Sequence, residues 1–537
     1  NDRAAIGNVA MSSGKWYYEV YYTASTNPEA GLARVQDSFA NSGATDGTDK
    51  FMYVTNSGAF RTPAWTATDA TGISAATSET VLGFAVDADN GKAFISVNGT
   101  YINSGDPAAG SNPQATFDAD WVTQTGGGIV PFIGQYAGTS GDVRINFGQD
   151  SSFSGVKATS NANADGEGHG SFQYAPPSGF LALCSQNLPD VDIIDGTDNF
   201  NTVLYTGNAT NPRSVTGVGF SPDFIWAKVR SNTYPHFLVN SVIGANKYLN
   251  TNSSDAETTT TGYYQSFDSD GFTVDNSGGI NGNNETFVSW NWLAGTAFSN
   301  DASATGVGNI DSAGQINAKA GFSIVSWTGT GSAGTIAHGI SKPELIIVKN
   351  RDQADKWVVY HEGQNANPAT GYVSLNETSA FGASSSVWND TAPTSTVFSV
   401  GTGGSVNASS EKYISYIFHS VEGYSKVGSY VGNNNADGAF VYTGFRPAWV
   451  IVKAYSTGGT HYDWAIYDSV RSPTNAIGAV LEANQTQAEV TGTGRGLPID
   501  FLSNGFKFRS SYAESNAAQS YIYLAFADQP FKFSNAR

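Results

Sequence analysis

Cysteine is nearly absent from this sequence, and its scarcity excludes a fold held together by disulfides. Cys184 is the only cysteine among 537 residues, so apolar cores alone have to stabilise the chain. It ends the apolar run GFLALC (179–184), where we expect a buried and unreactive thiol.

Long apolar runs are absent as well. A transmembrane helix needs roughly 20 consecutive apolar residues, and no segment approaches that length, so we expect no membrane insertion. No signal peptide is visible either. The sequence begins at Asn1, inside a polar segment, rather than at Met. We therefore expect the original N-terminus to lie upstream.

Charged residues are few, and basic ones are the fewest. Only 14% of residues are charged, and 27 Lys and Arg against 46 Asp and Glu give a formal net charge of −19. The basic residues are scattered, whereas nucleic-acid binding needs a basic patch. We expect no nucleic-acid partner, and we interpret the acidity as a source of solubility.

Motifs that carry chemistry are missing from the sequence. The six histidines are not at metal-ligand spacing, and there is no HExxH, CxxC, GxSxG, P-loop or dinucleotide fingerprint. A glycosidase would need two carboxylates facing each other across a cleft, which no motif reveals in advance. We expect no enzymatic activity, no catalytic residue and no cofactor. A glycan depolymerase remains the enzymatic alternative.

Two short acidic turns leave calcium open as a minor alternative. Asp87, Asp89 and Asn90 lie in DADNG, and Asp268 and Asp270 lie in FDSDG. Calcium prefers several oxygen ligands from one short loop. Neither segment has a full calcium-binding loop, and Asp or Asn before Gly is typical of turns.

What the sequence does contain is typical of β-structure. Aromatics reach 13%, Gly numbers 61, and long stretches with helical periodicity are absent. Aromatic and β-branched residues suit strands, while Gly, Asn, Asp and Ser suit the turns between them. The length predicts three to five domains. We expect an all-β protein built of tandem β-sandwich domains.

Residues 1–190 form the first predicted domain. Strand-like runs bounded by turn residues occur at the spacing of a sandwich: 15–22, 79–89, 92–102, 127–138 and 142–150. SGKWYYEV (13–20), LGFAVDADNGKAFISVNG (82–99), VPFIG (130–134) and RINFGQ (144–149) together resemble a SPRY domain. The resemblance implies a β-sandwich that binds protein partners through loops. That family has a strand before the GKWYYEV element. We expect this strand to be missing upstream, with a sandwich that has an open edge as the alternative.

The remainder contains three repeats, which we place at 191–300, 301–423 and 424–537. Each has a strand marked by a proline and ending in a lysine six positions later. The pairs are Pro222 and Lys228, Pro343 and Lys349, and Pro447 and Lys453. The apolar run between them suits a strand buried on both faces, and proline suits its start or an edge. We expect the lysines to emerge at strand ends, solvated or ion-paired.

The repeats resemble an uncharacterised domain found beside SPRY-like units in fibre and particle-surface proteins of marine bacteriophages. The residues that carry the resemblance are PPSGFLALCSQNLP (176–189), NTVLYTGN (201–208), SFDSDGFTV (266–274), SWNW (289–292) and ADQPFKFSNAR (527–537). The last looks like a chain end typical of that family. The resemblance implies a tail fibre, appendage or capsid-surface spike that attaches a virion to its host. A purely architectural virion protein is the third alternative.

These expectations define partners and candidate residues. We expect a host cell-surface protein or glycan and other virion proteins as partners, and a homo-oligomer, a trimer by analogy with fibres. We expect a location on the virion surface after assembly in the bacterial cytoplasm. Exposed aromatics bind sugars and proteins; Trp290, Trp292, Tyr17 and Tyr21 are the candidates, with core packing as the alternative. By analogy, we expect loops of the third repeat to meet the host.

Overall fold

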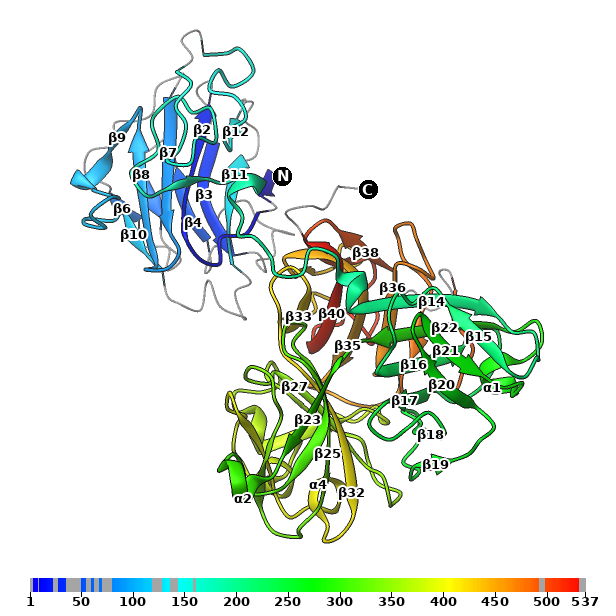
Figure 1. Cartoon of the computed structure of the whole chain (residues 1–537). Helices are drawn as coiled ribbons and strands as arrows, with labels where there is room; N and C mark the ends of the chain where they lie inside the picture. The colour runs from blue at the N-terminus through cyan, green and yellow to red at the C-terminus, as the bar shows by residue number, and fades with distance from the viewer. Residues whose placement is uncertain are drawn as a thin grey trace. The chain divides into compact units, whose positions relative to one another are not determined.

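The protein is nearly all β-structure and divides into two compact units, Asn1–Asp190 and Val191–Arg537, called unit 1 and unit 2 below (Figure 1). Its computed structural model describes residues 3–7, 9–22, 28–34, 50–54, 59–61, 67–69, 80–117, 128–135, 143–157, 161–491 and 498–530. The predicted chain-end segment 527–537 lies outside the described residues from 531 onward.

Unit 1 consists of two sheets. The first has the order β1 (Arg3–Ile6), β11 (Ile129–Gln135), β3 (Pro28–Arg34), β4 (Lys50–Val54), β5 (Ala59–Arg61) and β6 (Ala67–Asp69). The second has the order β10 (Ala115–Thr116), β8 (Lys92–Val97), β7 (Thr80–Asp87), β2 (Lys15–Tyr22) and β12 (Val143–Asn146). Two short strands extend it, β9 (Thr100–Tyr101) on β8 and β13 (Leu181–Ala182) on β2.

The two sheets enclose one core, so unit 1 is a β-sandwich. Trp16 and Tyr18 from β2 pack in the same buried cluster as Leu32 from β3 and Ile129 from β11. Alternate residues of a strand point to opposite faces, which places one set of each strand between the sheets. The expectation of a missing first strand needs correction, since β1 precedes β2 within the sequence and pairs with β11.

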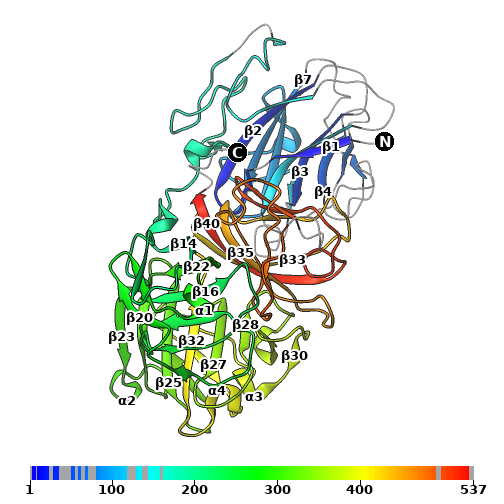
Figure 2. The same ribbon diagram turned by 90° about the vertical axis from the view of Figure 1, so that its right-hand side faces the viewer.

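Unit 2 contains three main sheets, one for each repeat, seen as three groups of strands in Figure 1; in Figure 2 the strands of the first and second repeats overlap, below those of the third. The first is β14 (Phe200–Thr206), β22 (Thr286–Trp292), β16 (Phe224–Val229) and β17 (Phe237–Asn240). The second is β23 (Thr296–Asn300), β24 (Ser312–Asn317), β25 (Phe322–Thr328), β32 (Lys412–Phe418), β27 (Leu345–Asn350), β28 (Val358–His361), β29 (Gly371–Ser374) and β30 (Gly382–Ala383). The third is β33 (Ser425–Val431), β40 (Ser520–Pro530), β35 (Phe445–Ala454), β36 (Ala465–Asp468) and β37 (Leu481–Glu482).

Smaller elements accompany each main sheet. In the first repeat these are β15 (Arg213–Thr216), β21 (Gly271–Val274), β20 (Tyr264–Asp268), β18 (Lys247–Tyr248), β19 (Thr258–Thr259) and α1 (Gly278–Asn281). In the second they are β26 (Gly334–Ala337), β31 (Val397–Val400), α2 (Ala302–Thr305), α3 (Ser385–Trp388) and α4 (Gly404–Asn407). In the third they are β34 (Phe440–Tyr442), β39 (Gly505–Phe508) and β38 (Ile499–Leu502). No helix of the described residues is long and apolar enough to cross a bilayer.

The proline-marked strands explain how the repeats pack. In β16, Phe224 and Trp226 belong to a central apolar cluster with residues from all three repeats. Ile225 and Ala227 belong to a cluster that contains residues of the first repeat only. β27 and β35 alternate in the same way between the central cluster and their own local ones. The prediction that these strands are buried on both faces is therefore confirmed. Each repeat is a sandwich with one face on its own small sheet and the other on a core shared by all three.

The predicted repeat boundary at residue 300 needs adjustment. β23 lies before that boundary, yet it pairs with β24 and so belongs to the second main sheet. Pro222 and Pro343 precede their strands as expected, whereas Pro447 lies inside β35, at a register shift, where the irregular pairing accommodates a proline.

Candidate functional site

The four aromatic candidates are all buried, so of the two interpretations offered for them, partner binding and core packing, the structure supports core packing. Trp290 and Trp292 are 0% and 1% exposed and belong to the shared core of unit 2. Tyr17 and Tyr21 are each 1% exposed. The outer face of β2 is covered by later chain: Phe172 packs edge-on against Tyr17, with ring centroids 5.1 Å apart. These side chains stabilise cores and do not meet a ligand at the surface.

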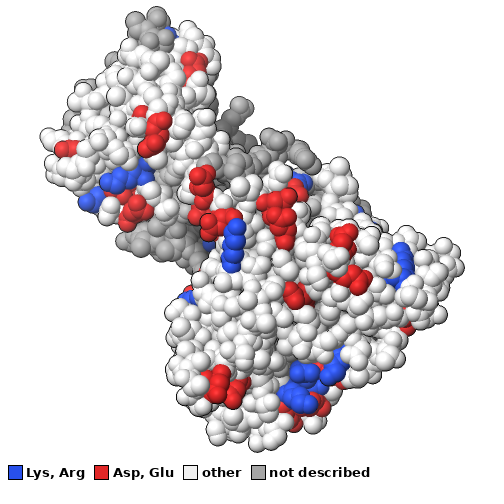
Figure 3. Space-filling model, viewed as in Figure 1, with Lys and Arg blue, Asp and Glu red and all other residues white. Residues whose placement is uncertain are grey.

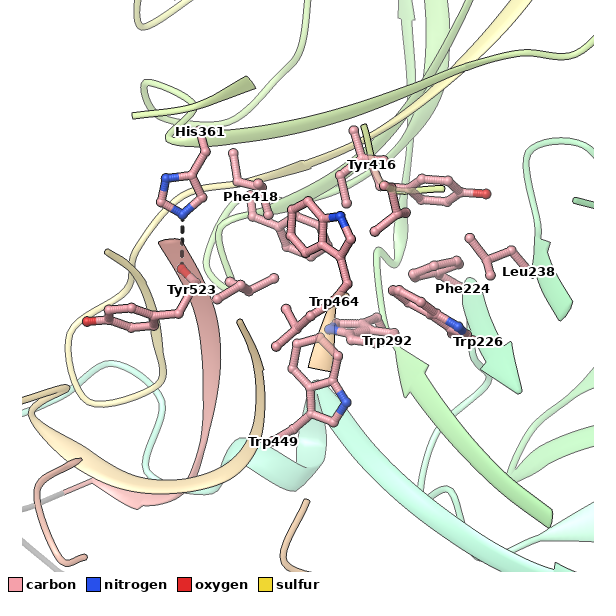
Figure 4. A pocket seen from close by; sticks show the side chains of 15 residues that line it. Phe224, Trp226, Leu238, Trp292, His361, Tyr416, Phe418, Trp449, Trp464 and Tyr523 are labelled. Atoms are coloured by element: carbon pink, nitrogen blue, oxygen red, sulfur yellow. Dashed lines mark hydrogen bonds between the residues drawn. The ribbon is translucent and has the colours of Figure 1, made fainter. Parts of the chain in front are cut away.

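The shared core contains a small apolar cavity (Figure 4). Its volume is about 20 Å³, and aromatic and aliphatic side chains of all three repeats surround it. A cavity of this size has room for about one water molecule and offers it no polar partners. It is a packing imperfection where three sheets meet rather than a ligand pocket.

A cyclic set of hydrogen bonds joins the repeats around this core. In each repeat, the residue just before β17, β28 or β36 donates a ring N–H to a backbone carbonyl of another repeat. The first repeat donates to the third, the second to the first, and the third to the second. The three bonds run from His236 Nε2 to the oxygen of Glu482 (3.0 Å), from Trp357 Nε1 to that of Asn250 (3.0 Å) and from Trp464 Nε1 to that of Ser374 (2.9 Å). The acceptors occupy equivalent positions, so each repeat donates once and accepts once.

The backbone N–H groups of the same three residues are held identically. Each donates to an asparagine side chain of its own repeat, which fixes the ring for its contact with the neighbour. The pairs are His236 with Asn252 (2.9 Å), Trp357 with Asn376 (3.0 Å) and Trp464 with Asn484 (2.9 Å). The backbone is therefore held in the same way in all three repeats. The first repeat makes the same ring-to-carbonyl bond with a histidine where the other two use a tryptophan.

A second cycle runs in the opposite sense. The last residue of β17, β28 or β36 reaches the closing strand of the next repeat, through a different chemical group each time. Asn240 Nδ2 donates to the Tyr416 hydroxyl (2.9 Å), His361 Nε2 donates to the Tyr523 carbonyl (3.0 Å), and Asp468 Oδ2 accepts from Trp290 Nε1 (3.0 Å). The dashed line in Figure 4 marks the second of these bonds. Unit 2 is thus a closed ring of three sandwiches.

Charged groups reinforce two of the three junctions. Arg230 forms a bidentate pair with Glu489, and Arg351 pairs with Glu257 (2.6 Å) at the equivalent place. At the third junction Tyr455 and Phe381 stand in these positions, joined by the same backbone bond. Glu489 also pairs with Arg471, which is fully buried and bonded to Asp468. The junction of the first and third repeats is therefore the most highly charged.

The three repeat lysines are not at the surface, which corrects our expectation for them. Lys228, Lys349 and Lys453 are each 0% exposed. Each ammonium donates to two backbone carbonyls, for example Lys228 Nζ to Val229 (2.7 Å) and Asn232 (3.3 Å). Burial lowers the pKa of each lysine to about 8. They join strand ends to neighbouring loops, and Lys453 also reaches Thr378 of the second repeat.

Two histidines of the junctions are held neutral. His236 Nδ1 accepts from Trp226 Nε1 (2.9 Å) and His361 Nδ1 accepts from the backbone N–H of Gly363 (3.0 Å). Since Nε2 is the donor in both, neither ring has a site for a second proton. Burial lowers the pKa of His236 well below its usual value and that of His361 to about 4. These histidines are structural connectors rather than acid–base groups.

The two acidic turns considered for calcium use their carboxylates on the protein itself. Asp87 accepts from the backbone and side chain of Asn90 and pairs with Lys15. Asp270 accepts from the backbone N–H groups of Gly217 and Gly219. These are the hydrogen bonds of tight turns.

A third acidic group was not visible in the sequence. Asp463, Glu482 and Glu514 are buried in the third repeat, with carboxylate oxygens within 4.8 Å of one another. Asp463 accepts from Asn484 Nδ2 (2.6 Å) and Gln485 Nε2 (2.7 Å). Asp463 and Glu514 both favour the protonated form of Lys453, so a cation of the chain itself lies near this group.

Comparison with known proteins adds a family. A crystal structure of a human SPRY domain is similar to part of this chain. The match covers 27% of this chain and 83% of the SPRY chain, with 15% sequence identity and a TM-score of 0.20. Among curated proteins, none matches. The sequence model of a domain of unknown function, DUF7483, matches residues 195–530, which are nearly all of unit 2. Because that match spans more than half of the sequence, the chain belongs to the DUF7483 family.

Proposed function

We propose that this protein is a non-enzymatic structural and adhesion component of a bacteriophage particle, a tail fibre, appendage or capsid-surface spike that mediates attachment to the host surface. The observation that carries the proposal is the closed ring of unit 2. Its buried histidines, lysines and arginine hold repeats and loops together. A block braced in this way suits the presentation of surface loops, and the phage-like segments of the sequence supply the particle context.

The charge distribution supports a binding role on a particle surface. On the face drawn in Figure 3, charged side chains are sparse and occur as small groups of both signs. Such a face suits contact with protein or glycan through neutral polar groups more than contact with nucleic acid. Host-surface protein or glycan and other virion proteins are the proposed partners, and the virion surface is the proposed location.

The test is binding of the fluorescently labelled full chain to candidate host cells, before and after treatment of the cells with protease or periodate. Saturable binding that one treatment abolishes is the expected result, and it separates a protein receptor from a glycan receptor. An unrelated acidic protein of similar size is the control for nonspecific adhesion. Absence of binding to every candidate host would favour a purely architectural role. Release of reducing ends from host polysaccharide would instead favour the depolymerase.

The proposal extends to a homo-oligomer, a trimer by analogy with fibres. Light scattering of the full chain measures this directly, and a mass three times that of the 56.4 kDa chain is expected. A monomer would count against the proposed fibre.

A further inference from the structure

A polar groove of about 380 Å³ opens at one end of the second main sheet. It is lined where β23 and β25 end and β24 and β32 begin, with Arg351 following β27 at the same end. Its volume lies within the range of roughly 300–1,000 Å³ typical of ligand sites. The groove shares no residue with the shared core, and of the described residues that line it Arg351 is the one that also takes part in a junction.

The groove belongs to the part of the second repeat that the other repeats lack. β14 and β33 are the end strands of their sheets, whereas the equivalent β25 carries two further strands, β24 and β23. The first and third repeats form the same sandwich without this hairpin, so the fold does not require it. β23 is mostly exposed. Insertions that the core does not need are frequent carriers of binding function.

A lysine specific to this repeat completes the groove. Lys412 lies opposite Thr328 in the sheet, and the equivalent positions hold Thr286 in the first repeat and Ser520 in the third. Its ammonium has no bonding partner among the described residues and it is exposed. Hairpin and lysine thus occur together and in one repeat.

The two sides of the groove carry opposite charges. Asp301 and Asp311 stand on the hairpin side, and Lys412 on the other, beside Arg351, whose charge is compensated by Glu257. Figure 3 shows acidic side chains over the α2 end of the second repeat. Asp301 caps α2 through Oδ1 and Asp311 Oδ1 accepts from Ala302 (2.9 Å). Oδ2 of each has no protein partner in the described part of the chain.

The floor between these sides is uncharged and rich in hydroxyl groups. Ser326 Oγ donates to the carbonyl of Ala313 (2.9 Å), and Thr328 lies exposed at the end of β25. A ligand of single charge would meet one side of like sign, with a repulsive cost. A neutral sugar avoids this, because some of its hydroxyls can donate to the carboxylates on one side while others accept from the cation on the other.

We propose that this groove binds a neutral saccharide of the host surface. The inference rests on the proposed attachment function and names its receptor class. It also moves the expected contact from loops of the third repeat to the inserted hairpin of the second. Specificity would come from hydrogen bonds of sugar hydroxyls to Asp311 and Lys412, whose backbone positions the sheet end fixes.

The test uses the labelled full chain on an array of bacterial surface oligosaccharides, from lipopolysaccharide cores, O-antigens and capsules, with peptides as a second class of spot. Lys412→Gln and Asp311→Asn each remove one charge from the groove. Lys319→Gln and Asp390→Asn make the same changes at exposed positions away from it. Binding of the natural sequence to a neutral saccharide, with affinity lowered about tenfold or more by each groove variant and unchanged in the controls, is expected. Thermal midpoints of all variants should agree.

Other outcomes overturn the inference and leave the proposed function separately testable. Saccharide binding that survives both groove variants, binding only to peptides, or no saccharide binding tighter than about 1 mM would each reject the groove as a glycan site. If host cells still bind the chain in those cases, attachment stands and its site is elsewhere. If saccharide binding depends on the groove but no host cell binds the chain, attachment fails and the groove assignment stands.

Discussion

Asp468, at the end of β36 in the third repeat, accepts a 3.0 Å hydrogen bond from the indole nitrogen of Trp290 in the first repeat. The guanidinium of Arg471 lies over the same indole, 5.4 Å from the ring centroid, and bonds to the same carboxylate. This contact closes the ring between the two repeats that are farthest apart in the sequence of unit 2.

Replacing Trp290 by Phe should therefore destabilise the protein by about 2–4 kcal/mol. The change removes a hydrogen bond to a buried carboxylate and leaves a cavity in a 0% exposed position. Urea unfolding followed by tryptophan fluorescence and by circular dichroism measures the loss. Val470→Ala, at a side chain 41% exposed, is the control and should change stability by less than about 0.5 kcal/mol. A Trp290→Phe protein as stable as the natural one would contradict the ring-closing role.

The three repeat lysines should make the protein more stable as the pH rises from 8 to 10. Their pKa of about 8 in the folded state lies below the unfolded value of 10.5. In this window the unfolded chain binds more protons, so deprotonation favours folding. The gain should reach at least about 1 kcal/mol. Above pH 10 the tyrosines oppose it, because burial raises the pKa of Tyr416 and others.

Unfolding midpoints in urea at pH 7.5, 8.5 and 9.5 test this expectation. Lys349→Met removes one of the three groups and should reduce the slope by about a third. Lys319→Met, at an exposed lysine, is the matched control and should leave the slope unchanged. Stability that is flat or falls between pH 8 and 10 in the natural sequence would contradict the burial of the three ammonium groups.

The sequence predicts the strands of unit 2 well because their signals are local. Continuous apolar runs after Pro222, Pro343 and Pro447 indicate strands with two buried faces, and the structure has them. What covers each face depends on segments far along the chain. Tyr17 in unit 1 is an example, since its ring packs against Phe172, a residue more than 150 positions later in the sequence. Alternation along β2 correctly separates two sets of aromatics, yet both sets turn out to be buried.

The burial of the three repeat lysines could not be predicted from the sequence either. A lysine at the end of an apolar strand predicts a solvated charge, because burial of an unpaired ammonium is costly. Lys453 avoids that cost through the carbonyls of Thr378 and Tyr462, and a carbonyl acceptor leaves no mark in the sequence. The hairpin that forms the groove has a weak signal of its own, namely that the second repeat is longer than the third. The spacing between Pro222, Pro343 and Pro447 does not show where in the second repeat the extra residues lie.

The junction histidines should make the protein acid-sensitive between pH 6.5 and about 4. The pKa of His361 is about 4 in the folded state, below its unfolded value of 6.5, and burial also lowers the pKa of His236 well below that value. The unfolded chain therefore binds more protons in this window, and stability falls as the pH falls. Each histidine contributes at most about 1.4 kcal/mol per pH unit. His361→Gln should flatten the profile between pH 6.5 and 4.5, whereas His461→Gln, at an exposed position, should not. Equal slopes for all three proteins, measured by thermal unfolding, would contradict the assignment.

The shared core predicts that no pair of repeats folds without the third. Residues of all three main sheets fill that core, including Trp292, Phe418 and Trp449. Removal of residues 424–537 would expose the inner faces of two sheets to water, at a cost of roughly 25 cal/mol for each Å² of apolar surface. We expect the fragment 1–423 alone to aggregate or to lack cooperative unfolding in unit 2.

Co-expression of fragment 1–423 with fragment 424–537 tests the same point without relying on a failure to fold. The two chains should copurify in equal amounts, because the junction bonds of Trp464 and Asp468 do not require the covalent link near residue 423. Trp464→Ala in the smaller fragment should weaken the association, since it removes both a buried ring and the bond to the Ser374 carbonyl. Glu422→Ala in the larger fragment, at an exposed side chain beside the break, is the control and should copurify normally. A monomeric fragment 1–423 with cooperative unfolding of its own would show that the third repeat is an independent domain and that the ring is not one folding unit.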